Sequence, residues 1–376
     1  MSRPPLAGVR VLDFTQLLPG AVCTMYLADL GAQVTKIEPP GSGEAARGPA
    51  GTPPGGIFHI TNRNKRSLAL DLKQADAVAA VRKLIAQADV IVEGFRPGVM
   101  ARFGLSYDDA RAINPAIVYC SITGYGQTGP LAHKAGHDLN YQSYAGIMGQ
   151  NVTDGSRPSP GNFPIADLAG GGLSSAVGIL AALLDARQTG TGRHIDISMT
   201  DCAMALNLAP LSSLQMFGNR EPMPGRDILS GGLPCYRTYE TADGKYLAVG
   251  ALEPKFWHAF CTAIERPDLV KRGWDMGPGL DGAVAEIAAV IAQKTLAEWV
   301  EIFAPVDACV APVLSLGESL AGENAKARDM VITVDGGGAK TTQFANPIRM
   351  TDFAFAVTAP PPLVGEHNDE ILGTLD

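Results

Sequence analysis

Cysteine is scarce in this sequence of 376 residues, and no two cysteines form a recognisable pair. There is no CxxC motif and no spacing typical of a zinc site, which predicts reduced thiols, a reducing compartment and no structural metal. The six cysteines are Cys23, Cys120, Cys202, Cys235, Cys261 and Cys309.

Long apolar runs and basic blocks are also absent. The N-terminal residues contain no apolar run of signal-peptide length, and charged residues interrupt the chain before about 18 consecutive apolar residues accumulate. The formal net charge is −8, which argues against non-specific binding to nucleic acid. We therefore expect a cytoplasmic protein with no membrane span and no nucleic-acid partner, in which an anionic ligand needs a local basic pocket.

Several common site motifs are missing. The first strand-to-helix turn, FTQLLPGA, contains only Gly20, so it lacks the GxGxxG pattern of a dinucleotide site. There is no Walker A motif, no GxSxG elbow and no HExxH. These absences disfavour P-loop NTPases, α/β-hydrolases and zinc proteases.

The first third of the chain alternates strand and helix patterns. Strands are predicted at 9–14, 33–39, 67–72, 89–95 and 117–123, and helices at 19–31 and 74–87. This alternation predicts an α/β fold with a large, open, Rossmann-like domain around a parallel sheet. Ligands bind at the carboxyl ends of such strands, so the loops after Phe14, Pro39, Phe95 and Thr123 are the first candidates for a site.

Composition then predicts a second, smaller α+β domain. The large domain is assigned to residues 1–217 and 330–376 and the small one to 218–329, because 218–232 is rich in glycine, proline and polar residues. Within the large domain an apolar helix is expected at 168–187, a strand at 193–199 and a second helix at 200–217. Asp243-Gly244 predicts a tight hairpin turn in the small domain.

Two residues are candidates for chemistry. His137 lies in a Gly-His-Asp loop after a predicted strand, where it is either a ligand-facing group or part of a well-packed turn. Asp167 precedes an apolar helix and is expected to cap it. Backbone amides beside Asp167 could hold a developing oxyanion, and Gly170, Gly171 and Gly172 would let a ligand approach the backbone.

Several blocks together resemble the family III CoA-transferases, which include the 2-methylacyl-CoA racemases. They are VLDFTQLLPGA, GAQVTKIEPPGSG, NRNKRSLALDLK, GFRPGVMARFGL, SITGYGQTGP, AGHDLNY, ADLAGG and GEHNDEIL, spread over nearly the whole chain. The resemblance implies an acyl-CoA substrate, no separate cofactor, and an interlocked homodimer. Its active sites would lie between the large domain of one subunit and the small domain of its partner.

The resemblance also assigns roles. Asp167 matches an aspartate that is a nucleophile in the transferases and an acid/base group in the racemases. His137 matches the second acid/base group of the racemases, and Glu253 in GALEPKF matches the residue that supports this histidine. Because all three occur here, a racemase is favoured. A CoA-transferase is the alternative, and a CoA-binding module without activity is a third reading.

CoA phosphates need basic partners. Residues 63–102 contain eight Lys or Arg against four acids, a local excess in an acidic protein. Where relatives often carry an arginine after the KIE block, this chain has Pro39, so that phosphate contact is either missing or supplied by a neighbour such as Arg47 or Arg63. By resemblance, the CoA-binding positions are Leu70, Asp71, Leu72, Lys73, Arg102, Ala135, Gly136, His137, Asp138, Leu139 and Asn140.

Overall fold

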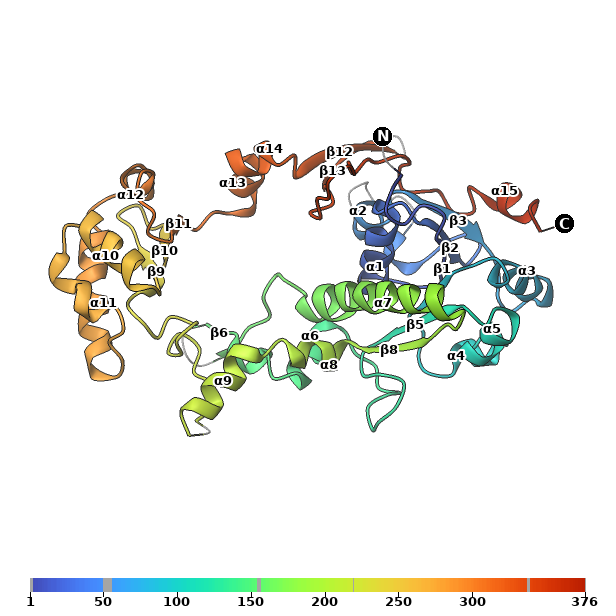
Figure 1. Ribbon diagram of the computed structural model, residues 1–376, viewed down its shortest axis with the longest axis horizontal. Coiled ribbons are helices and arrows are strands. Elements are labelled where there is room, and N and C mark those ends of the chain that lie inside the picture. Colours follow the sequence, from blue (N-terminus) through green and yellow to red (C-terminus); the bar gives the residue numbers. More distant parts are fainter. Residues whose placement is uncertain (1–2, 50–55, 154–156, 219, 337–338, 376) are drawn as a thin grey trace. The chain divides into compact units, whose positions relative to one another are not determined.

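The computed structural model describes residues 3–49, 56–153, 157–218, 220–336 and 339–375. It divides into two compact units, shown in Figure 1. The first comprises Met1–Ile147, Pro160–Leu206 and Glu323–Asp376, and the second comprises Met148–Ser159 and Asn207–Gly322.

A six-stranded, fully parallel sheet forms the centre of the first unit. Its strands lie in the order β3-β2-β1-β4-β5-β8. The predicted open α/β fold with a parallel sheet is therefore confirmed. The strands are β1 (Arg10–Asp13), β2 (Gln33–Glu38), β3 (Lys65–Ala69), β4 (Val90–Glu93), β5 (Val118–Thr123) and β8 (His194–Ser198).

Helices cover both faces of this sheet. The helices of the first unit are α1 (Leu18–Asp29), η1 (Ala45–Arg47), α2 (Ile57–Thr61), α3 (Ala75–Ile85), α4 (Val99–Arg102), α5 (Tyr107–Ile113), α6 (Asp138–Tyr144), the π-helical η3 (Ala166–Leu173), α7 (Ser174–Thr189), α8 (Met199–Ala205), α14 (Glu323–Ala327) and α15 (Asn368–Leu372). The hairpin of β12 (Val331–Gly336) and β13 (Ala339–Phe344) completes this unit.

Alternate side chains of the buried strands enter two separate cores. Val11 packs with α1 and α7 on one face, whereas Leu12 packs with α3, α4, α5 and α15 on the other. In β4, Val90, Ile91 and Val92 are all completely buried. A strand buried on both faces is an unbroken apolar run, which is the pattern that made this sheet predictable.

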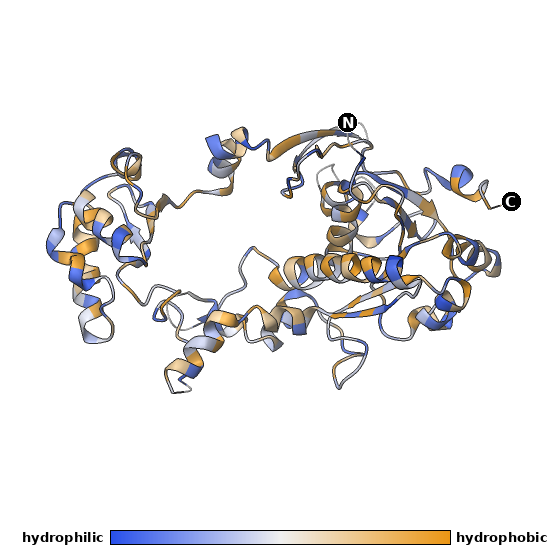
Figure 2. Cartoon of the chain, in the orientation of Figure 1, coloured by the Kyte–Doolittle hydropathy of each residue, from blue (hydrophilic) through white to orange (hydrophobic). Residues whose placement is uncertain are grey.

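The helix from Ala166 to Thr189 is long and apolar enough to cross a membrane by length and composition alone. The sequence was expected to contain no such stretch. The helix qualifies because the charged residues Asp167 and Asp185 lie only at the two ends of its apolar centre. Figure 2 shows apolar residues along α7. Less than half of its most apolar window is buried, and a core helix of a soluble protein passes the same test. One such helix is weak support for a membrane span.

The second unit has its own core beside an antiparallel sheet of order β11-β10-β9. The Asp243-Gly244 turn joins β9 to β10 with Gly244 at φ 71°, as predicted. The elements of the second unit are η2 (Met148–Gln150), β6 (Val152–Thr153), β7 (Arg157–Pro158), α9 (Leu208–Met216), β9 (Tyr236–Glu240), β10 (Tyr246–Gly250), α10 (Pro254–Ala263), η4 (Pro267–Arg272), α11 (Pro278–Ile291), α12 (Leu296–Phe303), β11 (Val310–Pro312) and α13 (Leu316–Ala321).

The boundaries between the units differ in detail from the expected domain limits. The predicted helix at 200–217 is two helices, and the second of them, α9, belongs to the second unit together with residues 148–159. No side chain of α9 is buried. The chain returns to the first unit at Glu323 rather than at residue 330.

All six cysteines are free thiols, as expected.

Candidate active site

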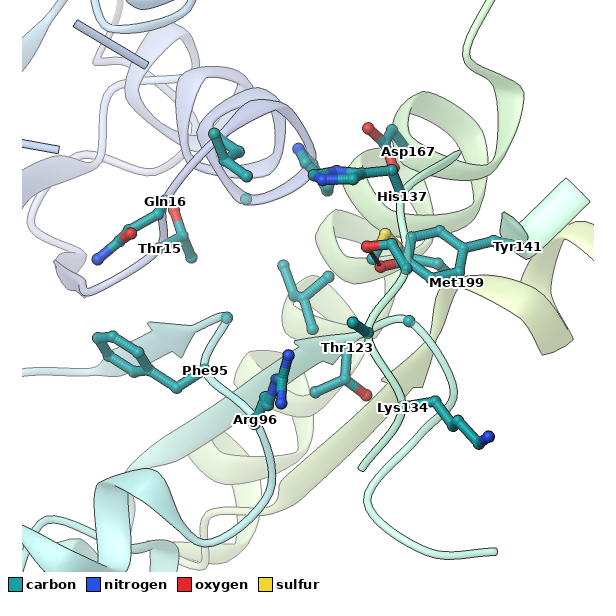
Figure 3. Close-up of a pocket in the computed structure, with 18 of the residues that line it drawn as sticks. Thr15, Gln16, Phe95, Arg96, Thr123, Lys134, His137, Tyr141, Asp167 and Met199 are labelled. Carbon is teal, nitrogen blue, oxygen red and sulfur yellow. Dashed lines mark hydrogen bonds between the residues drawn. The ribbon is translucent and has the colours of Figure 1, made fainter. Parts of the chain in front are cut away.

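A pocket of about 360 Å³ opens in the first unit at the carboxyl ends of β1, β4 and β5. It lies where the strand order changes direction between β1 and β4, the point at which open parallel sheets bind ligands. Three of the four loops named from the sequence line it, those after Phe14, Phe95 and Thr123, whereas the loop after Pro39 does not. Figure 3 shows His137 and Asp167 among the lining residues.

His137 is the residue immediately before α6. Its backbone is extended, and its N–H donates to Oδ1 of Asn140 at 3.1 Å. The preceding carbonyl, that of Gly136, accepts from the hydroxyl of Tyr141 at 2.5 Å. Burial and the charge of Asp167 raise the pKa of Tyr141 to about 12, so this hydroxyl stays protonated and keeps donating. These bonds fix the backbone that carries the exposed imidazole.

Asp167 does not cap a helix, contrary to the prediction. The helix begins one residue earlier, so Asp167 lies in the first turn of η3, and its carboxylate makes no capping bond. Asp138 takes that role: its Oδ1 accepts the N–H groups of Ala166 at 2.9 Å and of Asp167 at 3.1 Å. A helix end needs some acceptor for its free amides, but the sequence does not show that it comes from a distant loop.

Two causes raise the pKa of Asp167 to about 7. Burial is the larger, because it removes water from the ionised carboxylate, and the negative charge of Asp138 is the second. Near neutral pH this carboxyl group therefore exists in comparable amounts as acid and as base. Such a group can both release and accept protons at physiological pH.

Replacing Asp138 by Asn is expected to lower the pKa of Asp167. The amide oxygen can still accept from Ala166 and Asp167, but the neighbouring negative charge is gone and ionisation of Asp167 becomes easier. Any step in which Asp167 acts as base should then begin at lower pH. The pH dependence of kcat/KM measures this shift, and an unchanged acidic limb would contradict it.

The three glycines after Asp167 are buried in helix packing and do not form an open approach for a ligand. A Cβ on Gly170 would lie 2.9 Å from the carbonyl oxygen of Met199, and one on Gly172 would lie 2.9 Å from Cγ1 of Val22. The expectation of ligand contact at these glycines was wrong. They let η3 lie directly against α1 and α8, which brings Asp167 to the pocket.

The substitution Gly171→Ala is expected to destabilise the protein by about 1–3 kcal/mol, the usual range for overpacking. Its Cβ would lie 2.7 Å from Cβ of Pro19 and 3.0 Å from Sδ of Met199. Urea unfolding measures the loss. Gly317→Ala in α13 is the matched control, because no atom lies within 4 Å of its added Cβ, and it should not destabilise.

The predicted CoA-binding positions separate into two groups. Ala135, Gly136 and His137 line the pocket. The remaining positions do not line it: Leu70 and Leu72 pack against the core of the first unit, Asp71 accepts the N–H of Lys73, Asp138 caps η3, and Arg102, Leu139 and Asn140 are exposed.

Neither replacement suggested for the arginine at Pro39 is available. Arg47 is paired with Glu38 at 2.6 Å and lies over the ring of Phe58. Arg63 is 2% exposed and paired with Asp29 at 2.6 Å. Both guanidinium groups are held by ion pairs within the fold, which favours the other alternative, that the phosphate contact is missing at this position.

Sequence reasoning did not single out two basic residues that do line the pocket, Arg96 and Lys134. Both are exposed, as a phosphate partner needs to be. Arg96 follows the carboxyl end of β4, which was the available signal, but it was only one of eight basic residues counted in that region.

Among the described residues, no group of three His, Cys, Asp or Glu side chains could hold a metal ion.

Glu253 belongs to the second unit. It is exposed and precedes α10, where its carbonyl accepts the N–H of Trp257 at 3.1 Å. Its predicted support of His137 stays a prediction.

Comparison with known proteins gives the family. A model of CoA-transferase family III matches residues 6–368. The chain is 36% identical to the alpha-methylacyl-CoA racemase of Homo sapiens, over 98% of this chain and 92% of that protein. It is 35% identical to the probable fatty acyl-CoA transferase Rv3272 of Mycobacterium tuberculosis, over 97% and 96%. A CAIB/BAIF family protein from Brucella suis has the same fold, with a TM-score of 0.84 and 28% identity over 100% of both chains. The chain therefore belongs to CoA-transferase family III, as its sequence motifs indicated.

Proposed function

We propose that this enzyme is a racemase that inverts the α-carbon of 2-methylacyl-CoA thioesters. The observation that carries the proposal is that His137 and Asp167 line one pocket and that the pKa of Asp167 is about 7. Inversion needs one group to remove a proton from one face of the carbon and another to return a proton to the opposite face. An imidazole can both remove and return a proton, and so can a carboxyl group whose pKa is about 7.

The thioester makes the α-proton acidic, and its removal produces an enolate with negative charge on the thioester oxygen. His137 acts as base for one enantiomer and Asp167 for the other, and each acts as acid in the reverse direction. The amides of Ala166 and Asp167 already donate to Asp138, so they are not the oxyanion donors that the sequence suggested.

Arg96 and Lys134 are proposed to bind the CoA phosphates at the rim of the pocket, because both are exposed and carry the charge that phosphate needs. The positions carried over by resemblance, Leu70–Lys73, Arg102 and Ala135–Asn140, remain proposed CoA contacts. CoA would enter as part of the substrate, with no separate cofactor.

The enzyme is further proposed to be a cytoplasmic, interlocked homodimer in which Glu253 of one subunit orients His137 of the other. Four large apolar side chains spaced along η3 and α7 support a partner subunit, because they are exposed in the single chain. They are Leu173, Val177, Leu180 and Leu184, with exposed fractions of 42%, 68%, 37% and 62%.

Hydrogen exchange in heavy water tests the reaction. Either enantiomer of a 2-methylacyl-CoA should gain deuterium at the α-carbon and approach a racemic mixture, as measured by mass spectrometry and chiral separation. Absence of label above the enzyme-free background would exclude the racemase.

A CoA-transferase is the second candidate, because relatives named as transferases match the chain over nearly its full length. Asp167 would then attack an acyl-CoA as a nucleophile and form a covalent intermediate. Hydroxylamine trapping of an Asp167 adduct with acyl-CoA, and CoA transfer to a free carboxylic acid, would favour the transferase.

A further inference from the structure

Four charged side chains lie buried behind one wall of the pocket. They are Asp13, Lys36, Glu44 and Lys65, each at most 2% exposed. The ammonium of Lys36 lies 3.2 Å from Glu44 and 3.8 Å from Asp13, and that of Lys65 lies 3.5 Å from Asp13. We call these four residues the charge cluster. Its two positive and two negative groups balance, which is how charges are tolerated away from water.

The charge cluster binds both ends of the segment Thr15–Ala21, which contributes Thr15, Gln16, Leu17, Pro19 and Gly20 to the pocket. Lys36 donates to the carbonyl of Thr15 at 2.9 Å, and Lys65 donates to the carbonyl of Ala21 at 3.0 Å. Asp13 accepts the N–H of Thr15 at 2.9 Å and its hydroxyl at 2.6 Å. Thr24 links the two sides, because its hydroxyl lies 2.7 Å from both Lys65 and Asp13.

The segment between these anchors is strained at Leu17. Its φ is 65° and its ψ is −163°, a backbone conformation that residues other than glycine rarely adopt. Leu17 is 43% exposed and borders the pocket, so core packing of its own side chain is not what imposes this conformation. A strained residue persists where the surrounding structure over-determines it, and such residues cluster at functional sites.

We propose that the charge cluster positions the Thr15–Gly20 wall for binding of the acyl-CoA, with Lys36 as the principal positioning residue. The inference rests on the proposed function, since it takes the pocket as the acyl-CoA site. Stability alone does not explain the charge cluster, because buried ion pairs are often no more stabilising than apolar side chains of similar volume. The charge cluster also bonds to the backbone of the wall, and positioning this backbone is the function that we assign to it. His137 and Asp167 come from other segments, so the wall affects binding more than proton transfer.

The test replaces one ion pair at a time, so that no buried charge is left alone. Lys36→Met/Glu44→Gln removes the bond to the Thr15 carbonyl. It should raise KM for acyl-CoA about tenfold and lower kcat for α-proton exchange less than about threefold, as expected when ground-state binding is lost. Asp29→Asn/Arg63→Met is the matched control: it removes an equally buried pair at the far end of α1 and should leave KM within about twofold.

Equal increases of KM in both double variants, or none in the first, would overturn the proposal. If the first double variant does not fold, Thr24→Val replaces it, because this change removes only the hydroxyl that bonds to Lys65, Asp13 and the carbonyl of Gly20. In the folded variant it should raise KM about threefold, and an unchanged KM would overturn the proposal. Failure of the proposed function is distinguishable, because the unmodified enzyme would then show no saturable exchange with acyl-CoA.

Discussion

His137→Gln should reduce racemisation in both directions by about 10²- to 10⁴-fold, the usual contribution of a positioned acid or base. Glutamine is polar and of similar reach but takes up no proton near neutral pH. The enantiomer whose α-proton faces Asp167 should nevertheless keep exchanging that proton with solvent, because Asp167 can remove it and return one on the same face. Exchange with retention of configuration in heavy water is therefore the specific signature, read by chiral separation with mass spectrometry.

The matched control is His133→Gln. His133 is exposed on the same loop but does not line the pocket, so its replacement should leave racemisation unchanged. If the His137 variant racemises within a few-fold of the unmodified enzyme, the two-base mechanism fails. If it also transfers CoA to a free acid, the transferase is the better description.

Asp167→Asn should reduce racemisation by a similar factor, about 10²- to 10⁴-fold. Exchange should remain only for the opposite enantiomer, the one whose α-proton faces His137. The pair of variants thus assigns each residue to one face of the substrate. Asp201→Asn, an exposed aspartate of α8, is the activity control and should racemise normally. Loss of exchange for the same enantiomer in both the His137 and the Asp167 variants would contradict this assignment.

The same Asp167→Asn variant should become more stable relative to the unmodified enzyme as pH rises. In the folded enzyme the pKa of Asp167 is about 7, above its value of 3.8 when unperturbed, so the folded state binds the proton more tightly than the unfolded state does. The free energy of unfolding of the unmodified enzyme therefore falls between about pH 4 and pH 7. Asparagine removes this dependence, and the advantage of the variant should grow by on the order of 2 kcal/mol between pH 5 and pH 8. Urea unfolding at both pH values measures it, and a constant difference would contradict a raised pKa.

The sequence by itself determined the parallel sheet and the edge that carries the pocket. Apolar runs such as Val90–Val92 are buried on both faces, and that burial is set by local composition. Ligand binding at the carboxyl ends of parallel strands is a property of the fold, so the loops after Phe14, Phe95 and Thr123 followed from the order of elements. The likeness of separate motifs likewise established the family and drew attention to His137 and Asp167.

Only the tertiary structure decided what surrounds those two residues. Asp138 precedes Asp167 by 29 positions, yet it caps η3 and helps to raise the pKa of Asp167. The glycines after Asp167 proved to be contacts between helices. Arg63 carries the positive charge that a phosphate ligand needs, but it is buried against Asp29. In each case the deciding partner lies far away in the sequence. A residue's type fixes which interactions it can make, but the folded chain fixes which partner it meets and how much water remains around it.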